Sequence, residues 1–296
     1  MPLGGTRASA CEPCVTSLLA ARLPSLPCSR SVCRGEAREG GGRLPSPAMQ
    51  LTPGQMFITG LGVSYRAEGD GVVGRFEVSE HERVGGNRLV RAGVLATVAD
   101  VVAGWGANRH MFPRIPLTVD LSVHWLRPSD REVLDVTARV LKAGATTVVS
   151  EATFADPDTH QPAILSYVTF VVSPRPQDAF TQPLPERVQP SSLARPIMDD
   201  IGARVISPGV AELDRVPYVM QPAGTIQGGA VALLVELAAE SIAGAPIADL
   251  EIRYLAAIRI GPARATAEVI APGLARVEVR DVGRPDRLAT IALARF

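Results

Sequence analysis

The feature that most constrains the fold is a pair of long apolar segments, each interrupted by a single acid at the same place. The segments read RAGVLATVADVVAGWG and QGGAVALLVELAAE. Asp100 follows Gly93 by seven residues in the first, and Glu236 follows Gly229 by seven residues in the second. Apolar residues cover all sides of a helical wheel in both segments. The pattern therefore predicts two helices that are buried almost all round.

The flanking sequence repeats as well. Each long segment follows a short lead that we expect to be helical, QMFITGLGVSY or SLARPIMDDIGARVI, and then one strand-like stretch. Several strand candidates separated by turn residues come after it. The run Asp120-Leu-Ser-Val-His-Trp-Leu aligns with Asp249-Leu-Glu-Ile-Arg-Tyr-Leu. One buried helix followed by consecutive strands predicts a duplicated α+β unit, with each helix packed on an antiparallel sheet.

The predicted organisation has four parts. We expect a disordered leader at residues 1–48, a first domain at 49–174, a proline-rich linker at 175–196 and a second domain at 197–296. The leader is rich in Arg, Gly and Pro, which is typical of a segment that cannot bury a core. It also holds all four cysteines of the chain, at positions 11, 14, 28 and 33. A zinc ribbon and a targeting peptide are the alternatives for this segment.

Composition argues against several classes of partner. The formal net charge is +0 and aromatic residues make up 4% of the chain, so neither nucleic acid nor an anionic membrane surface is expected. The two acids interrupt the longest apolar runs, which leaves no uncharged run of bilayer length. We expect a cytoplasmic protein with no metal site.

The two acids and the glycines before them suggest a chemistry. A buried carboxylate is costly unless it is paired, hydrogen-bonded or open to a cavity. The glycines fall at the starts of the expected helices, where free backbone N–H groups can polarise a carbonyl oxygen. An acid two turns along the same helix is about 12 Å from those N–H groups. Two antiparallel helices side by side would instead bring the acid of one near the amides of the other.

Other catalytic motifs are missing from the sequence. All four histidines lie in the first repeat, and neither repeat contains a cysteine, a GxSxG elbow or a phosphate-binding glycine loop. A mechanism based on carboxylates is what remains.

These residues resemble the hot-dog thioesterase superfamily, in a tandem arrangement that covers most of the chain after Met49. The stretch QPAGTIQGG is similar to the family motif N-x-x-G-x-x-H-G-G, and an acid again follows seven residues later. The set of Gln221, Gly228 and Glu236 resembles the 4-hydroxybenzoyl-CoA thioesterase branch. The stretch TVDLSVHWLRP resembles thioesterases of the phenylacetate pathway. The first repeat departs from the motif, with Gly85 at the Asn or Gln position and RAG in place of HGG.

The resemblance implies two hot-dog domains that pair as an intramolecular pseudo-dimer with two composite sites. One site would join Asp100 to Gln221 and to the amides of Gly228 and Gly229, and we favour it as the working site. The other would join Glu236 to the amide of Ala92 or Gly93, with Asn87 as the available side-chain amide.

The implied activity is hydrolysis of an acyl-CoA, in which CoA is part of the substrate and no further cofactor is needed. Gly228 would polarise the thioester carbonyl, and Gln221 would orient the water or the carboxylate. Asp100 would either attack the carbonyl or activate a water that does. Arginines at the rim could hold the CoA phosphates, and aromatic residues could line an acyl pocket. The candidates are Arg88, Arg91, Arg127 and Arg253 for the rim, and Trp105, Trp125 and Tyr254 for the pocket.

Two other functions stay open. A hot-dog protein that binds acyl-CoA without hydrolysing it would keep the fold and the pocket. A hot-dog dehydratase or hydratase would normally pair its acid with a histidine, and His81 lies nineteen positions before Asp100. We also expect that two such chains could pair as a homodimer.

Overall fold

The computed structural model describes residues 56–85, 88–174, 183–284 and 287–296. All of them belong to one compact unit, residues 46–296. The whole predicted leader, with its four cysteines, lies outside the described residues, and so does Asn87. The predictions for those positions therefore stay predictions, as do the domain boundaries.

Two long helices dominate the described part of the chain. Helix α1 spans Ala92–Met111 and helix α3 spans Gly228–Ala243. Both contain the predicted acid, and both begin at the small residues that the sequence placed there. A short helix, α2, spans Ile197–Ile201. Three single turns of 3₁₀ helix complete the set: Phe57–Thr59, Glu80–Glu82 and Pro217–Val219.

The predicted helical leads are mostly wrong. The first lead contains one 3₁₀ turn and then enters strand β1, and the second contains α2 and then enters strand β7. Valine and tyrosine near the end of the first lead favour an extended strand, and pairing with the next strand satisfies the backbone there.

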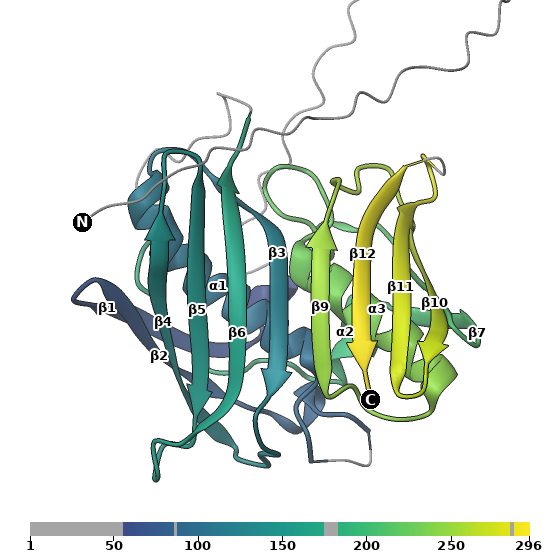
Figure 1. The fold of residues 1–296 in the computed structure, drawn as a ribbon, viewed down its shortest axis with the longest axis horizontal. Helices are drawn as coiled ribbons and strands as arrows, with labels where there is room; N and C mark the ends of the chain where they lie inside the picture. The colour runs from purple at the N-terminus through teal and green to yellow at the C-terminus, as the bar shows by residue number, and fades with distance from the viewer. Residues whose placement is uncertain (1–55, 86–87, 175–182, 285–286) are drawn as a thin grey trace, which may run out of the picture. The chain divides into compact units, whose positions relative to one another are not determined.

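The described strands form one twelve-stranded sheet in which every neighbouring pair is antiparallel (Figure 1). Its order is β1-β2-β4-β5-β6-β3-β9-β12-β11-β10-β8-β7. The strands of the first half are β1 Gly62–Glu68, β2 Gly71–Glu77, β3 Pro116–Trp125, β4 Val133–Ala143, β5 Thr147–Ala155 and β6 Pro162–Val172. Those of the second half are β7 Arg204–Ser207, β8 Val210–Leu213, β9 Asp249–Tyr254, β10 Ala263–Ala271, β11 Leu274–Asp281 and β12 Leu288–Arg295.

The two halves of the sheet are related by a pseudo-twofold axis between β3 and β9. Read outward from this junction, the strand order of one half repeats that of the other. Across the junction, Asp120 pairs in register with Arg253, and His124 pairs with Asp249. The side chains are within 2.8 Å in the first pair and 3.3 Å in the second. Because the repeat alignment equates the two aspartates, these are the same contact made twice.

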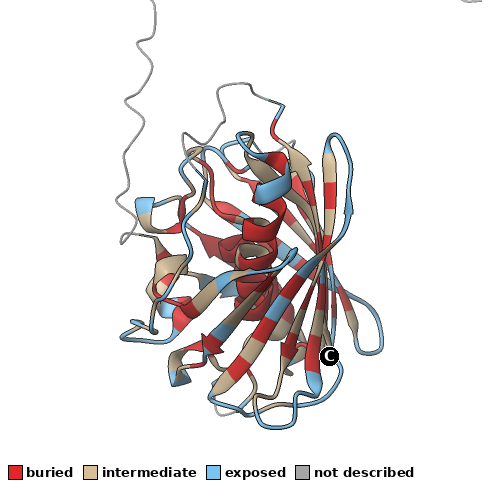
Figure 2. Cartoon of the chain, turned by 90° about the vertical axis from the view of Figure 1, so that its left-hand side faces the viewer, coloured by how far each residue is buried: buried red, intermediate tan, exposed pale blue. Residues whose placement is uncertain are grey.

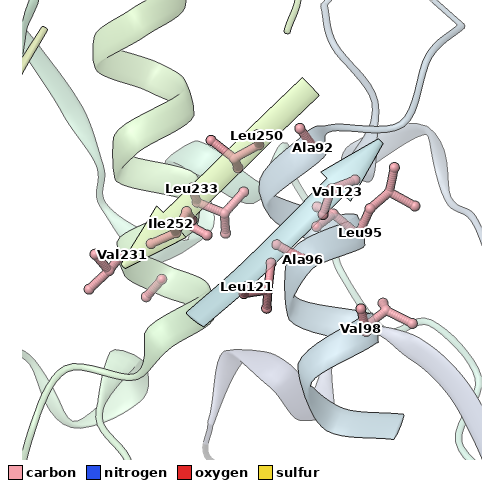
Figure 3. Close-up of a cluster of buried hydrophobic side chains, with 14 of the residues drawn as sticks. Ala92, Leu95, Ala96, Val98, Leu121, Val123, Val231, Leu233, Leu250 and Ile252 are labelled. Carbon is pink, nitrogen blue, oxygen red and sulfur yellow. The ribbon is translucent and has the colours of Figure 1, made fainter. Parts of the chain in front are cut away.

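The hydrophobic core lies between the helices and one face of the sheet. Helix α1 packs on β1–β6, and helix α3 packs on strands of the second half. Figure 2 shows buried residues gathered where the helices meet the sheet, and alternating buried and exposed residues along the strands. Near the axis, side chains of both helices meet those of β3 and β9, as in the cluster of Leu95, Leu121, Leu233 and Ile252 (Figure 3). The predicted α+β layering is confirmed.

Two glycines let the long helices approach each other closely. A methyl group added at Gly93 would lie 2.8 Å from the backbone N and Cα of Leu233. One added at Gly229 would lie 2.6 Å from Cγ2 of Thr97. These equivalent contacts run in opposite directions along the two helices, so α1 and α3 lie side by side and antiparallel. The acid of each helix thus comes near the first turn of the other.

Candidate active site

A cavity of about 530 Å³ opens between the two halves of the sheet. Its wall includes Asp100 from α1, Gln221 from the loop before α3, and Gly228 from the first turn of α3. The structure thus brings three of the predicted site residues to a single cavity. Apolar and aromatic side chains form most of the remaining wall.

Asp100 is held on the cavity wall by one hydrogen bond. The hydroxyl of Thr118, on β3, donates to its Oδ1 over 2.5 Å. Burial raises the pKa of Asp100 to about 6, against the lowering effect of the Thr118 hydrogen bond. At neutral pH the side chain is therefore a carboxylate in a largely apolar wall, which makes it a stronger base than an exposed aspartate.

The first turn of α3 supplies hydrogen-bond donors. Gln227 precedes the helix, and its side chain does not cap it. Among the described residues, the N–H of Gly228 has no acceptor. The side-chain oxygen Oε1 of Gln227 is also buried without a partner there. A ligand in the cavity could satisfy both groups, since Gly228 and Gln227 line it.

Tyr254 and Thr225 complete this side of the cavity. The hydroxyl of Tyr254 donates to the carbonyl oxygen of Gly228 over 3.0 Å, which fixes the start of α3. Burial, together with the charge of Asp100, raises the pKa of Tyr254 and keeps it a neutral donor. The side-chain amide of Gln221 donates to the hydroxyl of Thr225 over 2.6 Å. This bond leaves the carbonyl oxygen of the Gln221 side chain as an acceptor for a water molecule.

The second composite site is filled by its own acid. Glu236 accepts hydrogen bonds from the N–H of Ala92 over 3.2 Å and from the N–H of Gly93 over 2.8 Å. Arg91 lies 3.5 Å from Glu236 and 2.9 Å from Glu240. The structure therefore brings the predicted residues together, but the donors already have an acceptor. Aspartate is one methylene shorter than glutamate, so Asp100 does not close the first site in this way.

The two glutamates of the second site share one arginine. Burial, followed by the charge of Glu240, raises the pKa of Glu236 to about 8. Burial also raises the pKa of Glu240. We infer that the pair retains a proton at neutral pH, because one guanidinium cannot balance two buried carboxylates.

This pair predicts a pH-dependent stability. The unfolded chain loses the Glu236 proton near the ordinary value of 4.5, whereas the folded chain holds it to about 8. The free energy of unfolding should therefore fall as pH rises between these values. Chemical denaturation at pH 5, 6.5 and 8 measures the slope. In Glu240→Gln the slope should be smaller, and an equal slope in both proteins would contradict the shared proton.

Backbone pairing corrects one position in the first repeat. The bridge between Arg83 and Val90 corresponds to the bridge between Met220 and Ile226. The N–H of Val84 bonds to the carbonyl of Leu89 as the N–H of Gln221 bonds to that of Thr225. Val84, rather than Gly85, therefore aligns with Gln221, because the first loop is one residue longer. A valine offers no side-chain amide to the second site.

Residues 89–163 match the family model of the thioesterase superfamily. No curated protein matches the chain. An acyl-ACP thioesterase from Bacteroides thetaiotaomicron is similar in structure, with a TM-score of 0.57 and 14% sequence identity. This similarity covers 77% of the present chain and 98% of the other. The 12:0-ACP thioesterase from Umbellularia californica has a TM-score of 0.55 and 12% identity, and the match covers 78% and 98% of the two chains.

This chain has a tandem hot-dog fold. At these identities the solved structures show the fold alone. They confirm the predicted arrangement of two hot-dog units joined as a pseudo-dimer.

The predicted rim arginines of the hot-dog protein lie away from the cavity wall. Each binds a neighbouring side chain instead: Arg88 binds Asp130, Arg91 binds the two glutamates, Arg127 binds Gln161 and Arg253 binds Asp120. Of the predicted pocket aromatics, Trp105 and Tyr254 line the cavity, and Trp125 does not.

Sequence reasoning missed Thr118 and Arg187, which also line the cavity. Strand alternation from the aligned Asp120 could not have marked Thr118, because the register of β3 shifts between Thr118 and Asp120. Arg187 lies in the predicted linker, and no local pattern marked it.

Two observations apply to the part of the hot-dog protein that the structure describes. None of its helices is long and apolar enough to cross a membrane. None of its histidine, cysteine, aspartate and glutamate side chains gather in groups of three or more that could hold a metal ion.

Proposed function

We propose that this protein hydrolyses an acyl-CoA thioester at the composite site of Asp100, Gln221 and Gly228. The observation that supports the proposal best is a single cavity shared by a buried carboxylate of one repeat and the helix N-terminus of the other, whose Gly228 N–H has no acceptor among the described residues. Thioester hydrolysis needs both a base or nucleophile and donors for the developing oxyanion. The thioesterase-superfamily match over residues 89–163 supports the same reaction class.

In the proposed reaction the N–H of Gly228 donates to the thioester carbonyl oxygen. The dipole of α3 adds positive potential at the same point. In the general-base route, Asp100 takes a proton from a water held by Gln221, and the resulting hydroxide attacks the carbonyl carbon. The tetrahedral intermediate then collapses, the carbon–sulfur bond breaks, and the thiolate leaving group takes up a proton. In the nucleophilic route, the Asp100 carboxylate attacks the carbonyl carbon, the carbon–sulfur bond breaks and the CoA thiolate leaves; water then hydrolyses the resulting anhydride, and the thiolate takes up a proton.

The proposal is tested by measuring thiol release from a panel of acyl-CoAs with short, long, branched and aromatic acyl groups. We expect at least one ester to be turned over with saturable kinetics. The panel should include the same acyl groups on an acyl carrier protein, because both similar solved structures are described as ACP thioesterases. Turnover of the ACP esters alone would show that the substrate is carried by acyl carrier protein rather than by CoA. Ligand binding without any turnover would instead favour the non-catalytic acyl-CoA-binding protein.

The pH dependence of the reaction should report the ionisation of Asp100. Because the reactive form is the carboxylate, kcat/KM should rise with pH and level off above the pKa of about 6. In Thr118→Val the stabilising hydrogen bond to the carboxylate is lost, so the rise should move to higher pH. If the pH profile of kcat/KM is unchanged in this variant, Asp100 is not the group whose ionisation controls the reaction. Ser150→Ala, a buried hydroxyl outside the cavity wall, is a matched control.

A further inference from the structure

The cavity holds a second charged group that the proposed reaction does not use. Arg187 lines the same wall as Asp100, together with Tyr65, Trp105 and Leu184. Arg187 lies within the predicted linker, residues 175–196. Its backbone pairs with that of Tyr65 in β1 through two hydrogen bonds, of 2.8 and 3.1 Å. The backbone of Arg187 is thereby fixed beside Tyr65 of β1, which also lines the cavity.

The guanidinium of Arg187 is only partly satisfied. Its Nη2 donates to the carbonyl oxygens of Ile58 over 2.8 Å and Leu61 over 3.3 Å. Its Nε is buried and has no acceptor among the described residues. A buried N–H of a charged group that lacks an acceptor is costly, so native structures normally provide a partner.

No carboxylate balances this charge in the described part of the chain. The adjacent Glu186 turns to the N–H of Ala67 and accepts from it over 3.1 Å. Burial raises the pKa of Tyr65, which therefore stays a neutral phenol beside Arg187. Asp100 lines the same cavity without forming an ion pair with Arg187. An arginine that faces a cavity without a counter-charge is suited to an anionic ligand group.

On helix α1, the residue that contacts the segment of Arg187 is Trp105, whose Nε1 donates to the carbonyl oxygens of Leu184 and Pro185. Trp105 lies five residues after Asp100, about 7.5 Å along the helix axis. Its ring packs on Tyr65 with 5.8 Å between ring centroids, and Arg187 pairs with Tyr65. The cavity wall also includes the apolar residues Ile58 and Phe170. A ligand that reaches both charges needs an apolar middle section.

We propose that Arg187 binds a carboxylate at the far end of the acyl group, so that the preferred substrates are monothioesters of medium-chain dicarboxylic acids. This inference rests on the proposed function for the orientation of the ligand, because the thioester carbonyl must lie at Asp100 and Gly228. The apolar section would then hold the methylene chain, and the carboxylate would bond to Nε of Arg187.

The test compares adipyl-CoA with hexanoyl-CoA, which have the same chain length and differ in the terminal carboxylate. Binding is measured by titration calorimetry in the Asp100→Asn background, where hydrolysis does not interfere. We expect adipyl-CoA to bind about tenfold more tightly than hexanoyl-CoA, as for one charge-assisted hydrogen bond. Adding Arg187→Met should abolish this preference and leave hexanoyl-CoA binding within a few-fold. Arg187→Lys should retain part of it.

Arg109→Met is the matched control. Arg109 lies over the ring of the same Trp105, at 5.9 Å from its centroid, and is exposed. This variant should keep the preference for adipyl-CoA. Equal binding of the two esters in Asp100→Asn would overturn the inference. An equal loss of binding affinity for both esters and for free CoA in Arg187→Met would also overturn the inference. Arg187 would then act on the CoA group or on the structure of the linker.

The outcomes separate this inference from the proposed function. A preference for adipyl-CoA that depends on Arg187, in a protein whose wild type hydrolyses neither ester, would support the carboxylate site and contradict the hydrolase. Hydrolysis of both esters at equal kcat/KM would support the hydrolase and contradict the carboxylate site. Glutaryl-CoA and suberyl-CoA then define the chain length that the apolar section accepts.

Discussion

Replacing Asp100 by asparagine is expected to lower kcat for thioester hydrolysis by about 10³-fold, whichever carboxylate route operates. Asparagine has nearly the same shape and can still accept the hydrogen bond from Thr118. It cannot take a proton from water, and it is a poor nucleophile. The loss should therefore appear in kcat, with KM changed by less than a few-fold. Steady-state kinetics on the best ester of the acyl-CoA panel measure both constants.

Glu236→Gln is the matched control for this loss. Glu236 occupies the equivalent position in the other repeat, but it is buried and already bonded to the amides that its site would need. Hydrolysis should stay within a few-fold of wild type, although the variant can be less stable. If Glu236→Gln abolished turnover and Asp100→Asn did not, the working site would be the second one.

Single turnover in ¹⁸O-labelled water separates the two routes. In the nucleophilic route, water that attacks the Asp100 carboxyl carbon of the anhydride puts ¹⁸O into Asp100, and the released acid keeps an unlabelled oxygen from Asp100. In the general-base route the new oxygen of the acid comes from water and Asp100 stays unlabelled. Mass spectrometry of the acid and of the peptide that contains Asp100 measures both, and label in Asp100 identifies the nucleophilic route.

The second large effect concerns the contact between the long helices. Gly93→Ala should lower the free energy of unfolding by about 3 kcal/mol, because the new methyl group lies 2.8 Å from backbone atoms of Leu233. Backbone in the middle of a helix cannot move aside without separating α1 from α3. Urea denaturation followed by circular dichroism measures the change.

Two further variants check the cause of that loss. Gly229→Ala makes the equivalent clash against a side chain, Thr97, so adding Thr97→Ala should restore part of the stability. Shortening a neighbouring side chain should not restore the stability of Gly93→Ala, because its methyl group meets backbone atoms. Gly104→Ala, on the same helix, brings its methyl no closer than 3.4 Å to the Phe170 ring. It should be neutral or slightly stabilising, because alanine favours the helix. A similar loss in Gly104→Ala would contradict the proposed steric origin.

Much of the architecture could be predicted because the sequence is duplicated. Equal spacing from glycine to acid placed two buried helices and suggested that they run antiparallel. Strand runs after each helix predicted the sheet, and the aligned aspartates at 120 and 249 turned out to flank the junction between its halves. The leads were misjudged because short segments follow their sheet partners more than their own helix propensity.

The sequence by itself determined the duplicated fold, the two buried acids and the glycines that bring them near the opposite helix, because each of these depends on local spacing and hydrophobicity. Only the tertiary structure decided that the two sites differ. One methylene lets Glu236 reach the amides of α1, while Asp100 bonds to Thr118 and leaves a cavity open beside α3. It also placed Arg187 on that cavity wall. Such relations depend on distances between atoms far apart in the chain, which no local pattern encodes.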